Sequence, residues 1–336
     1  MFSEQFQVII RRVLILISHP VIVRPMRARS YLNLAFSLVI LSTSVAFGMR
    51  TIPLPGCAVV GEVVALSAAS GDIHYQTYGI PSSEATILIH GLGSSAHTFE
   101  TVGPKLGENG FTVAYDQRGH RFSKERGMSF DSITLADDLK NLMQHLGITS
   151  ANLVGVSLGA KAAIRFAQMN PEKTRSLTIV DMEAIPRGEI VDPVILLERA
   201  VALKAEVPLR FTTVGEGVAA LGKLGKYILP ANQGDFIYDE RSHQYRPRVR
   251  PYVSYLYSHQ GNREDLSTAL ETVKAPVWVL RADPMKGSAI DDAGWVGLEK
   301  VIPQARRIIF TGVGHNIPKL APEKFVEAIE RIRTWK

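Results

Sequence analysis

The chain has 336 residues, enough for one large domain with an insertion or for two smaller domains, and either arrangement could bury a substantial core. Its 46% hydrophobic content is that of a globular protein, and a single cysteine cannot form an internal disulfide or a metal site of cysteine ligands. The formal charge of +6 does not indicate a nucleic-acid partner, because several arginines lie within the first fifty residues, beside apolar stretches.

Residues 1–58 are expected to form a leader. No charged residue lies between Arg29 and Arg50, and the apolar run 31–47 is long enough to cross a bilayer as a helix. Arginines are frequent before this run, whereas only Arg50 follows it closely. The positive-inside rule therefore places the rest of the chain outside the cytoplasm. We expect a periplasmic or otherwise extracytoplasmic bacterial protein, released or anchored to the membrane.

The sequence leaves the kind of leader open. Translation from Met26 would give the order of a cleaved bacterial secretory signal, and an uncleaved run would act as a membrane anchor. Residues 54–57, Leu-Pro-Gly-Cys, resemble a lipobox, at which a lipoprotein is cut and lipidated on Cys57. Arg50 and two prolines separate this cysteine from the apolar run, and a buried core helix is the structural alternative.

From residue 59 to 336 the pattern predicts one α/β domain with a mainly parallel, doubly wound sheet. Short β-rich apolar runs alternate with helical patterns, as expected when helices cover both faces of such a sheet. The strands are predicted at residues 85–90, 112–116, 152–156, 176–181, 277–281 and 307–311. A leucine face at 135–146 predicts one of the helices, ended by Gly147.

Between about residues 184 and 274 the alternation fails. The segment reads as helices and loops rich in tyrosine and arginine, and we interpret it as a mostly helical cap inserted between two core strands. A cap there would cover the carboxyl ends of the strands, where open α/β sheets bind ligands. Its arginines could meet a carboxylate or a membrane surface, or could simply be solvated: Arg241, Arg246, Arg248 and Arg250.

Ser157 is the expected nucleophile of a serine hydrolase. It stands at the centre of Gly155-Val-Ser-Leu-Gly159, which follows an apolar strand and opens a helical stretch at 160–167. This order predicts a nucleophile elbow, a strained strand-to-helix turn that exposes the serine hydroxyl at the helix N-terminus. The flanking glycines let the backbones approach without a Cβ clash. An ordinary turn serine is the alternative interpretation.

A second loop supplies the expected oxyanion hole. Residues 89–93, Ile-His-Gly-Leu-Gly, end an earlier strand, and backbone N–H groups held in a dry pocket stabilise the oxyanion that forms during ester cleavage. Leu92 and Leu158 are the candidate donors, through their backbones. We expect His90 to shape the loop by hydrogen bonding and not to transfer protons.

His315 is the predicted general base. It lies in residues 312–316, Gly-Val-Gly-His-Asn, directly after the last predicted strand. A loop bounded by glycines lets the imidazole reach over Ser157, where it can take the serine proton and later return it to the leaving group.

These three motifs together resemble the α/β-hydrolase superfamily, and the resemblance extends over nearly all of residues 60–336. Residues 116–120, Asp-Gln-Arg-Gly-His, add to it, since these enzymes commonly carry such a loop after the fourth strand. Arg121 stands where they usually have glycine, a departure that concerns the shape of the loop near the pocket rim. The resemblance implies a serine esterase-like enzyme with a cap and without a metal or organic cofactor.

The resemblance leaves the catalytic acid open. In the family's usual order it follows the seventh strand, and Asp283 lies about two residues before the customary position. A branch similar to some haloalkane dehalogenases places a glutamate after the sixth strand, where Glu183 stands. We expect one of these two carboxylates to accept a hydrogen bond from His315. Further candidates are Asp181, more often a structural residue at a strand end, Asp291 and Asp292.

The serine nucleophile restricts the reaction that the resemblance implies. Dehalogenases and epoxide hydrolases of this fold use aspartate, so the expected reaction is hydrolysis of a small carboxylic ester or lactone through an acyl-enzyme. Two alternatives stay open. One is a carbon–carbon bond hydrolase of the same fold, and the other is a ligand receptor with little turnover.

Overall fold

A computed structural model describes residues 59–67, 71–125, 127–184, 192–206, 208, 210–222, 236–261 and 264–335. The predicted leader, with Cys57, lies outside these residues. Within them, no helix combines the length and apolarity that a membrane crossing needs. Contacts divide the chain into residues 1–51 and 52–336, and all elements described below belong to the second unit.

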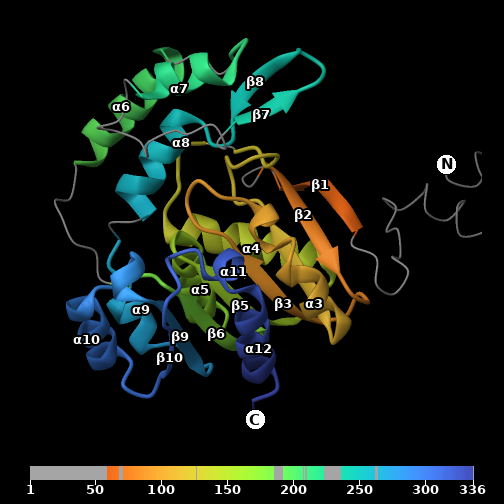
Figure 1. The fold of residues 1–336 in the computed structure, drawn as a ribbon, viewed down its shortest axis with the longest axis vertical. Helices are drawn as coiled ribbons and strands as arrows, with labels where there is room; N and C mark the ends of the chain where they lie inside the picture. Colours follow the sequence, from red (N-terminus) through yellow and green to blue (C-terminus); the bar gives the residue numbers. More distant parts are fainter. Residues whose placement is uncertain are drawn as a thin grey trace, which may run out of the picture. The chain divides into compact units, whose positions relative to one another are not determined.

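An eight-stranded sheet forms the centre of this unit (Figure 1). The strand order is β1-β2-β4-β3-β5-β6-β9-β10, in which β1 and β2 are antiparallel to their neighbours and the other six strands are parallel. The strands are β1 (Val59–Ser67), β2 (Gly71–Tyr78), β3 (Glu84–Ile89), β4 (Phe111–Tyr115), β5 (Ser150–Val156), β6 (Thr174–Val180), β9 (Val277–Ala282) and β10 (Arg306–Phe310). The fold class and the six predicted strands are confirmed, with bounds within two residues. The β1–β2 pair was not predicted.

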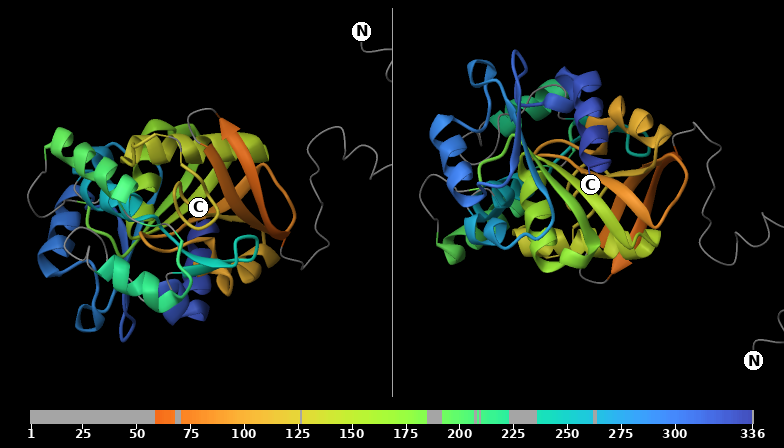
Figure 2. Two further views of the ribbon diagram at one scale, coloured as in Figure 1. Left: turned by 90° about the horizontal axis from the view of Figure 1, so that it is seen from above. Right: turned by 90° about the horizontal axis from the view of Figure 1, so that it is seen from below.

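Helices cover both faces of the sheet, as Figure 2 shows. Helices α4 (Ser132–Leu146) and α5 (Leu158–Met169) pack on one face, and α3 (Val102–Glu108) and α12 (Pro322–Arg333) pack on the other. Alternate strand residues enter the two cores, because successive side chains point to opposite faces. Ile87 and Ile89 of β3 lie in the first core, and Leu88 lies in the second.

Helix α4 ends, as predicted, at Gly147, whose φ of 68° is left-handed and suits glycine. The remaining elements outside the segment between β6 and β9 are η1 (Ala96–Phe99), η2 (Pro171–Lys173), η5 (Pro284–Lys286), α10 (Asp292–Val301) and α11 (Ile317–Leu320).

The segment between β6 and β9 carries its own elements, and we call residues 193–271 the cap segment. They are α6 (Pro193–Glu206), α7 (Val214–Gly222), β7 (Phe236–Asp239), β8 (Gln244–Pro247), α8 (Pro251–Leu256), η4 (Tyr257–Gly261) and α9 (Ser267–Glu271). Strands β7 and β8 form an antiparallel hairpin, which the prediction of helices and loops did not include. Strands of only four residues are too short to show a recognisable apolar alternation.

Polar contacts attach the cap segment to loops at the carboxyl ends of the core strands. Arg121, beyond the end of β4, donates its backbone N–H to the carbonyl of Arg248 at 2.7 Å. Farther along, the buried ammonium of Lys161 on α5 donates to the carbonyl of Glu264 at 2.9 Å. The carboxylate of Glu264 accepts from the Ser132 hydroxyl at 2.7 Å. The cap segment therefore lies at the edge of the sheet where ligands bind in open α/β folds (Figure 1).

Candidate active site

The turn between β5 and α5 holds Ser157 in a strained conformation. Its φ of 51° and ψ of −124° lie where non-glycine residues are rare, at a cost on the order of 1–3 kcal/mol. Two backbone bonds fix the turn: the Ser157 N–H donates to the Val180 carbonyl at 2.8 Å, and the Ala160 N–H donates to the Ser157 carbonyl at 2.9 Å. The predicted elbow conformation is thus present.

Glycines around the elbow are required by close packing. A Cβ added at Gly159 would lie 2.3 Å from the Ile89 carbonyl oxygen, and one at Gly155 would lie 2.4 Å from Ala160 Cα. Gly91 abuts the serine itself, since an added Cβ there would lie 3.0 Å from Ser157 Cβ. The ends of β3 and β5 and the start of α5 therefore meet at one point.

His315 is hydrogen-bonded to Asp181, the residue that follows β6. The distance from His315 Nδ1 to Asp181 Oδ2 is 2.7 Å, and the carboxyl group is fully buried whereas the imidazole is 40% exposed. A carboxylate only accepts hydrogen bonds, so Nδ1 carries the proton. In the neutral ring Nε2 is then left with a lone pair, the form that a general base needs.

Four donors hold the Asp181 carboxylate. Besides His315, they are the Ser288 hydroxyl at 2.6 Å, the Ala289 N–H at 2.8 Å and the Ala282 N–H at 3.0 Å. Burial raises the pKa of Asp181, but the hydrogen bonds, that from His315 first among them, outweigh it and leave the pKa below its usual value. Asp181 is therefore a carboxylate at neutral pH.

The sheet explains how His315 reaches the neighbourhood of Ser157. Strand β10 lies three positions from β5, which is roughly 14 Å at the usual strand spacing. Asp181, however, follows β6, which pairs directly with β5, and Val180 accepts the backbone bond of Ser157. The loop after β10 must therefore cross β9 to bond Asp181, which brings its histidine to the end of β6, next to the elbow.

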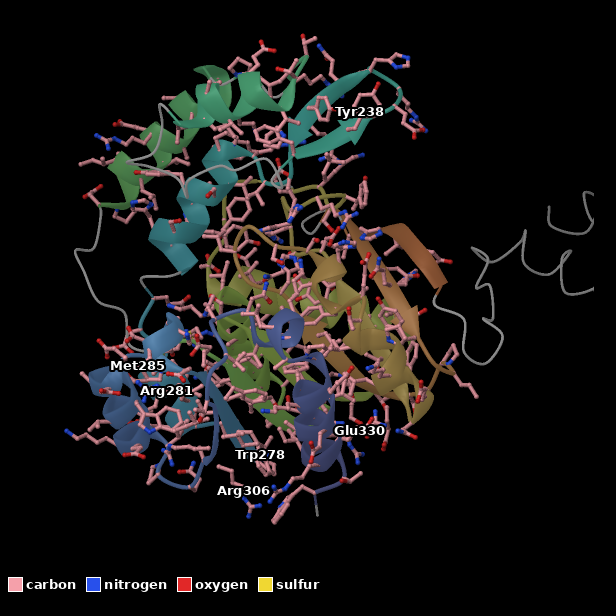
Figure 3. All side chains as sticks on the ribbon, in the orientation of Figure 1. Tyr238, Trp278, Arg281, Met285, Arg306 and Glu330 are labelled. Carbon is pink, nitrogen blue, oxygen red and sulfur yellow. The ribbon has the colours of Figure 1, made fainter. Side chains whose placement is uncertain are left out.

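The prediction that Asp283 or Glu183 accepts the bond from His315 is wrong. Asp283 accepts instead from the backbone N–H groups of Gly312 at 2.6 Å and Met285 at 2.8 Å, which lower its pKa. Its carboxylate thus ties the histidine loop to the end of β9, and the neighbouring Met285, labelled in Figure 3, is exposed.

The other acidic candidates also have different surroundings. Glu183 lies against α10, because a Cβ added at Gly294 would come within 2.5 Å of Glu183 Oε1. Asp291 accepts from the Gly294 N–H at 2.8 Å as the N-cap of α10, and Asp292 pairs with Arg281 at 2.7 Å. None of these positions is the one that holds the imidazole.

Residues 91–95, which we call the oxyanion loop, follow β3 and contain Leu92, one of the two predicted backbone donors. Within the described part of the chain, the Leu92 N–H has no hydrogen-bond acceptor. Leu158 is the first residue of α5, where N–H groups have no intrahelical partner. By contrast, the Gly93 N–H donates to His120 Nε2 at 3.3 Å, which orients the loop.

Two buried histidines support the oxyanion loop. His90 Nε2 accepts from the Gln117 N–H at 2.9 Å, and His90 Nδ1 lies 2.7 Å from the Gly91 carbonyl, which it can only meet as a donor. His120 has the same tautomer, because its Nε2 also accepts a backbone N–H. Burial lowers the pKa of both rings, that of His120 to about 3. His90 thus has the shaping contacts expected of it.

Sequence reasoning named Asp181 only as a further candidate, behind Asp283 and Glu183, because the family's usual order points to the seventh strand. The local signal, an aspartate directly after a buried apolar strand, is shared by Asp116, Asp181 and Asp283. The order of the strands in the sheet distinguishes them, because of the three only Asp181 follows a strand that pairs with β5. The residues around each aspartate do not reveal that order.

The neutral state of His120 predicts a pH dependence of stability. Between its ordinary pKa of 6.5 and about 3, the unfolded chain binds a proton that the folded chain does not. The free energy of unfolding should therefore fall as pH drops below 6.5, by up to about 1.4 kcal/mol per pH unit from this residue. His120→Gln, whose amide oxygen can still accept from Gly93, should show a shallower slope in urea denaturation between pH 7 and 5. Equal slopes would contradict a neutral, buried His120.

Comparison with known proteins identifies relatives of this chain. The sequence pattern of the alpha/beta hydrolase fold family matches residues 85–322. The chain is 28% identical over 254 residues to 2-(acetamidomethylene)succinate hydrolase from Mesorhizobium japonicum, covering 74% of this chain and 87% of that protein. It is 34% identical over 101 residues to an esterase from Mycobacterium tuberculosis, covering 30% and 34%.

Solved structures show the same fold. The crystal structure of E-2-(acetamidomethylene)succinate hydrolase has a TM-score of 0.61 at 22% identity, covering 81% of this chain and 98% of that one. A thioesterase domain from the curacin biosynthetic pathway has a TM-score of 0.64 at 21% identity, covering 81% and 100%. With the family pattern matched over most of the chain, the protein belongs to the alpha/beta hydrolase fold family and is a hydrolase of that fold.

Proposed function

We propose that the protein is a serine hydrolase that cleaves a carboxylic ester or lactone through an acyl-enzyme. The observation that carries this proposal is the 2.7 Å bond between His315 and the buried Asp181, at the end of the strand next to the strained Ser157. A serine, a histidine and a carboxylate in this relation form a unit that activates a hydroxyl group for attack on a carbonyl.

In the proposed acylation step, Ser157 Oγ attacks the carbonyl carbon while His315 Nε2 takes the hydroxyl proton. The carbonyl electrons move to oxygen, and the backbone N–H groups of Leu92 and Leu158 stabilise the resulting oxyanion. Collapse of the tetrahedral intermediate expels the alcohol, which receives the proton from His315. A water molecule, deprotonated by the same imidazole, then releases the acid and restores the serine.

Asp181 orients the imidazole and stabilises its charged form. Its four hydrogen bonds keep it ionised, with its pKa below the usual value, so it can offset the imidazolium that forms in both steps. The fixed carboxylate also prevents the ring from turning its protonated nitrogen toward Ser157.

The names of two relatives support acyl transfer to water, but they do not identify the substrate of this chain. One relative is named as an esterase and another as a hydrolase of 2-(acetamidomethylene)succinate. The carbon–carbon bond hydrolase and the receptor stay as alternatives, since the same three residues serve the first and are compatible with the second.

The proposal is tested with a fluorophosphonate probe and p-nitrophenyl esters of graded chain length. Wild-type protein should be labelled and should release p-nitrophenol, whereas Ser157→Ala should lose labelling and at least about 10³-fold of turnover, because the triad acts as a unit. Labelling without turnover of any ester would favour one of the two alternatives. Near-normal turnover by the alanine variant would exclude Ser157 as the nucleophile.

The assignment of the acid gives a separate prediction. Asp181→Asn should lower kcat by about 10⁴-fold, because the amide favours the wrong imidazole tautomer. The matched control is Glu183→Gln, which lies against α10 and should keep kcat within about threefold of wild type. Circular dichroism should show that both variants are folded. The reverse ranking of the two variants would return the role to Glu183.

We further propose that the leader exports the protein from the cytoplasm. The support is the sequence alone, an uncharged run after a basic flank. Fractionation of bacteria that express the full chain should find the hydrolase outside the cytoplasm, and Cys57→Ser should release it from the membrane only if the cysteine is lipidated. Recovery of the unprocessed chain in the soluble cytoplasm would refute the proposal.

A further inference from the structure

A cavity of about 290 Å³ lies between the cap segment and the loop that follows β4. Gly119 and residues 121–124 line one wall, and the other is lined by residues of the cap segment, namely Arg210, Arg246, Pro247, Arg248 and Arg250. Arg246 belongs to β8, part of the hairpin on which Figure 3 labels Tyr238. We call this space the basic cavity, because its lining includes the cations Arg121, Lys124, Arg210, Arg246, Arg248 and Arg250.

Carboxylates neutralise only part of this charge. Three of the cations have a carboxylate partner, namely Lys124 with Asp72, Arg210 with Asp239, and Arg250 with Glu125. Arg121 and Arg246, by contrast, have no carboxylate within 4.0 Å among the described residues. Arg246 Nη1 instead donates to the neutral carbonyl of Arg121 at 2.8 Å. The cavity thus carries a positive surplus.

The positive charge that carboxylates leave unneutralised includes a partly buried guanidinium group, that of Arg246, close to other cations. Burial lowers the pKa of Arg246, and the guanidinium groups of Arg250, Arg210 and Arg121 lower it further against the opposing effect of Asp239. Arg121 and Arg246 flank the same ring, since their Cζ atoms lie 4.9 and 5.8 Å from the centroid of Phe122. An anion between such groups would relieve their mutual repulsion.

Arg121 adds two independent signs of a binding role. Its φ of 44° is left-handed, a conformation that strains any residue other than glycine. Its Nε is buried without a hydrogen-bond partner, although buried N–H groups are nearly always paired. A glycine would avoid both costs, but it would remove a guanidinium group from the wall of the cavity.

The basic cavity adjoins the oxyanion loop. None of its lining residues is Ser157, His315 or Leu92. Arg121 Nη1, however, lies 3.4 Å from Ser95 Oγ, at the end of that loop. Ser95 and Leu92 belong to the same loop, so the side chain of Arg121 connects the cavity wall to the loop that carries one of the proposed oxyanion donors.

We propose that the basic cavity binds an anionic group, a carboxylate or phosphate, at the end of the substrate remote from the scissile bond. This inference rests on the proposed ester hydrolysis. It assigns Arg121 and Arg246 to substrate binding and selects esters whose acyl chain ends in a negative charge. A free anion that is not part of the substrate is the other source of the same chemistry.

The test compares two p-nitrophenyl esters of equal acyl length, the neutral butyrate and the carboxylate-terminated succinate, with the spontaneous hydrolysis of each measured without enzyme and subtracted, because the succinate carboxylate attacks its own ester. Wild-type kcat/KM should favour the succinate ester by at least about tenfold in 20 mM salt. Arg246→Gln should reduce that preference by about 10- to 100-fold, the usual effect of losing a hydrogen bond to a charged group. The control is Arg175→Gln, which pairs with Glu84 on the surface and should retain the full preference.

Salt provides a measurement that needs no variant. Raising sodium chloride from 20 to 500 mM should reduce the wild-type preference for the succinate ester and leave butyrate turnover nearly constant, because screening affects only the charged end. Hydrolysis of both esters with no preference in low salt would overturn this inference while leaving the proposed function intact. If neither ester is cleaved and the probe does not label the protein, the proposed function itself fails.

Calorimetry with inorganic phosphate separates the two sources of the anion. Competitive inhibition of succinate-ester hydrolysis by phosphate, weakened in Arg246→Gln, would support a substrate subsite. Phosphate binding that depends on Arg246 but leaves hydrolysis of the succinate ester uninhibited would assign the cavity to a separate anion and overturn the proposal.

Discussion

The hydrogen bond between His315 and Asp181 is the interaction on which the rest of the site depends. A carboxylate with no exposed surface would lose several kcal/mol of solvation without compensation. Asp181 is compensated by donors from β9, from residues 288–289 and from the histidine loop, and all of these reach it at the carboxyl edge of the sheet. The same contacts that keep the carboxylate ionised therefore fix the position of the imidazole.

Backbone strain is concentrated at this edge. Among the described residues other than glycine, four have a positive φ, and three of them, Arg121, Ser157 and Asp181, directly follow or lie near the ends of core strands. Strain of this kind persists only where surrounding contacts over-determine the conformation. The packing of Gly159 on Ile89, of Gly91 on Ser157 and the strand-end bonds of Asp181 supply those contacts.

The features that could be predicted from the sequence are those that depend on short runs of consecutive residues. The elbow, the oxyanion loop and the histidine loop each depend on a few consecutive residues at the end of an apolar strand, so they were recognisable without a structure. The acid was not, because Asp181 and Asp283 differ only in which strand lies beside β5. The β7–β8 hairpin was missed for a related reason, since each of its strands has only four residues and pairs only with the other, so neither shows an apolar period.

A transient negative charge on the proposed oxyanion and a permanent negative charge on a ligand would meet different groups of the protein. The buried histidines under the oxyanion loop are neutral, so the charge that develops on the proposed oxyanion would meet only backbone dipoles that are already oriented. The guanidinium groups lie instead in the basic cavity, beyond Ser95, where a permanent anion would find them. A full positive charge directly beneath the loop would need His90 or His120 to be protonated. Protonation would break the bonds that the Gln117 and Gly93 N–H groups donate to these rings, so the loop keeps its geometry only while both histidines stay neutral.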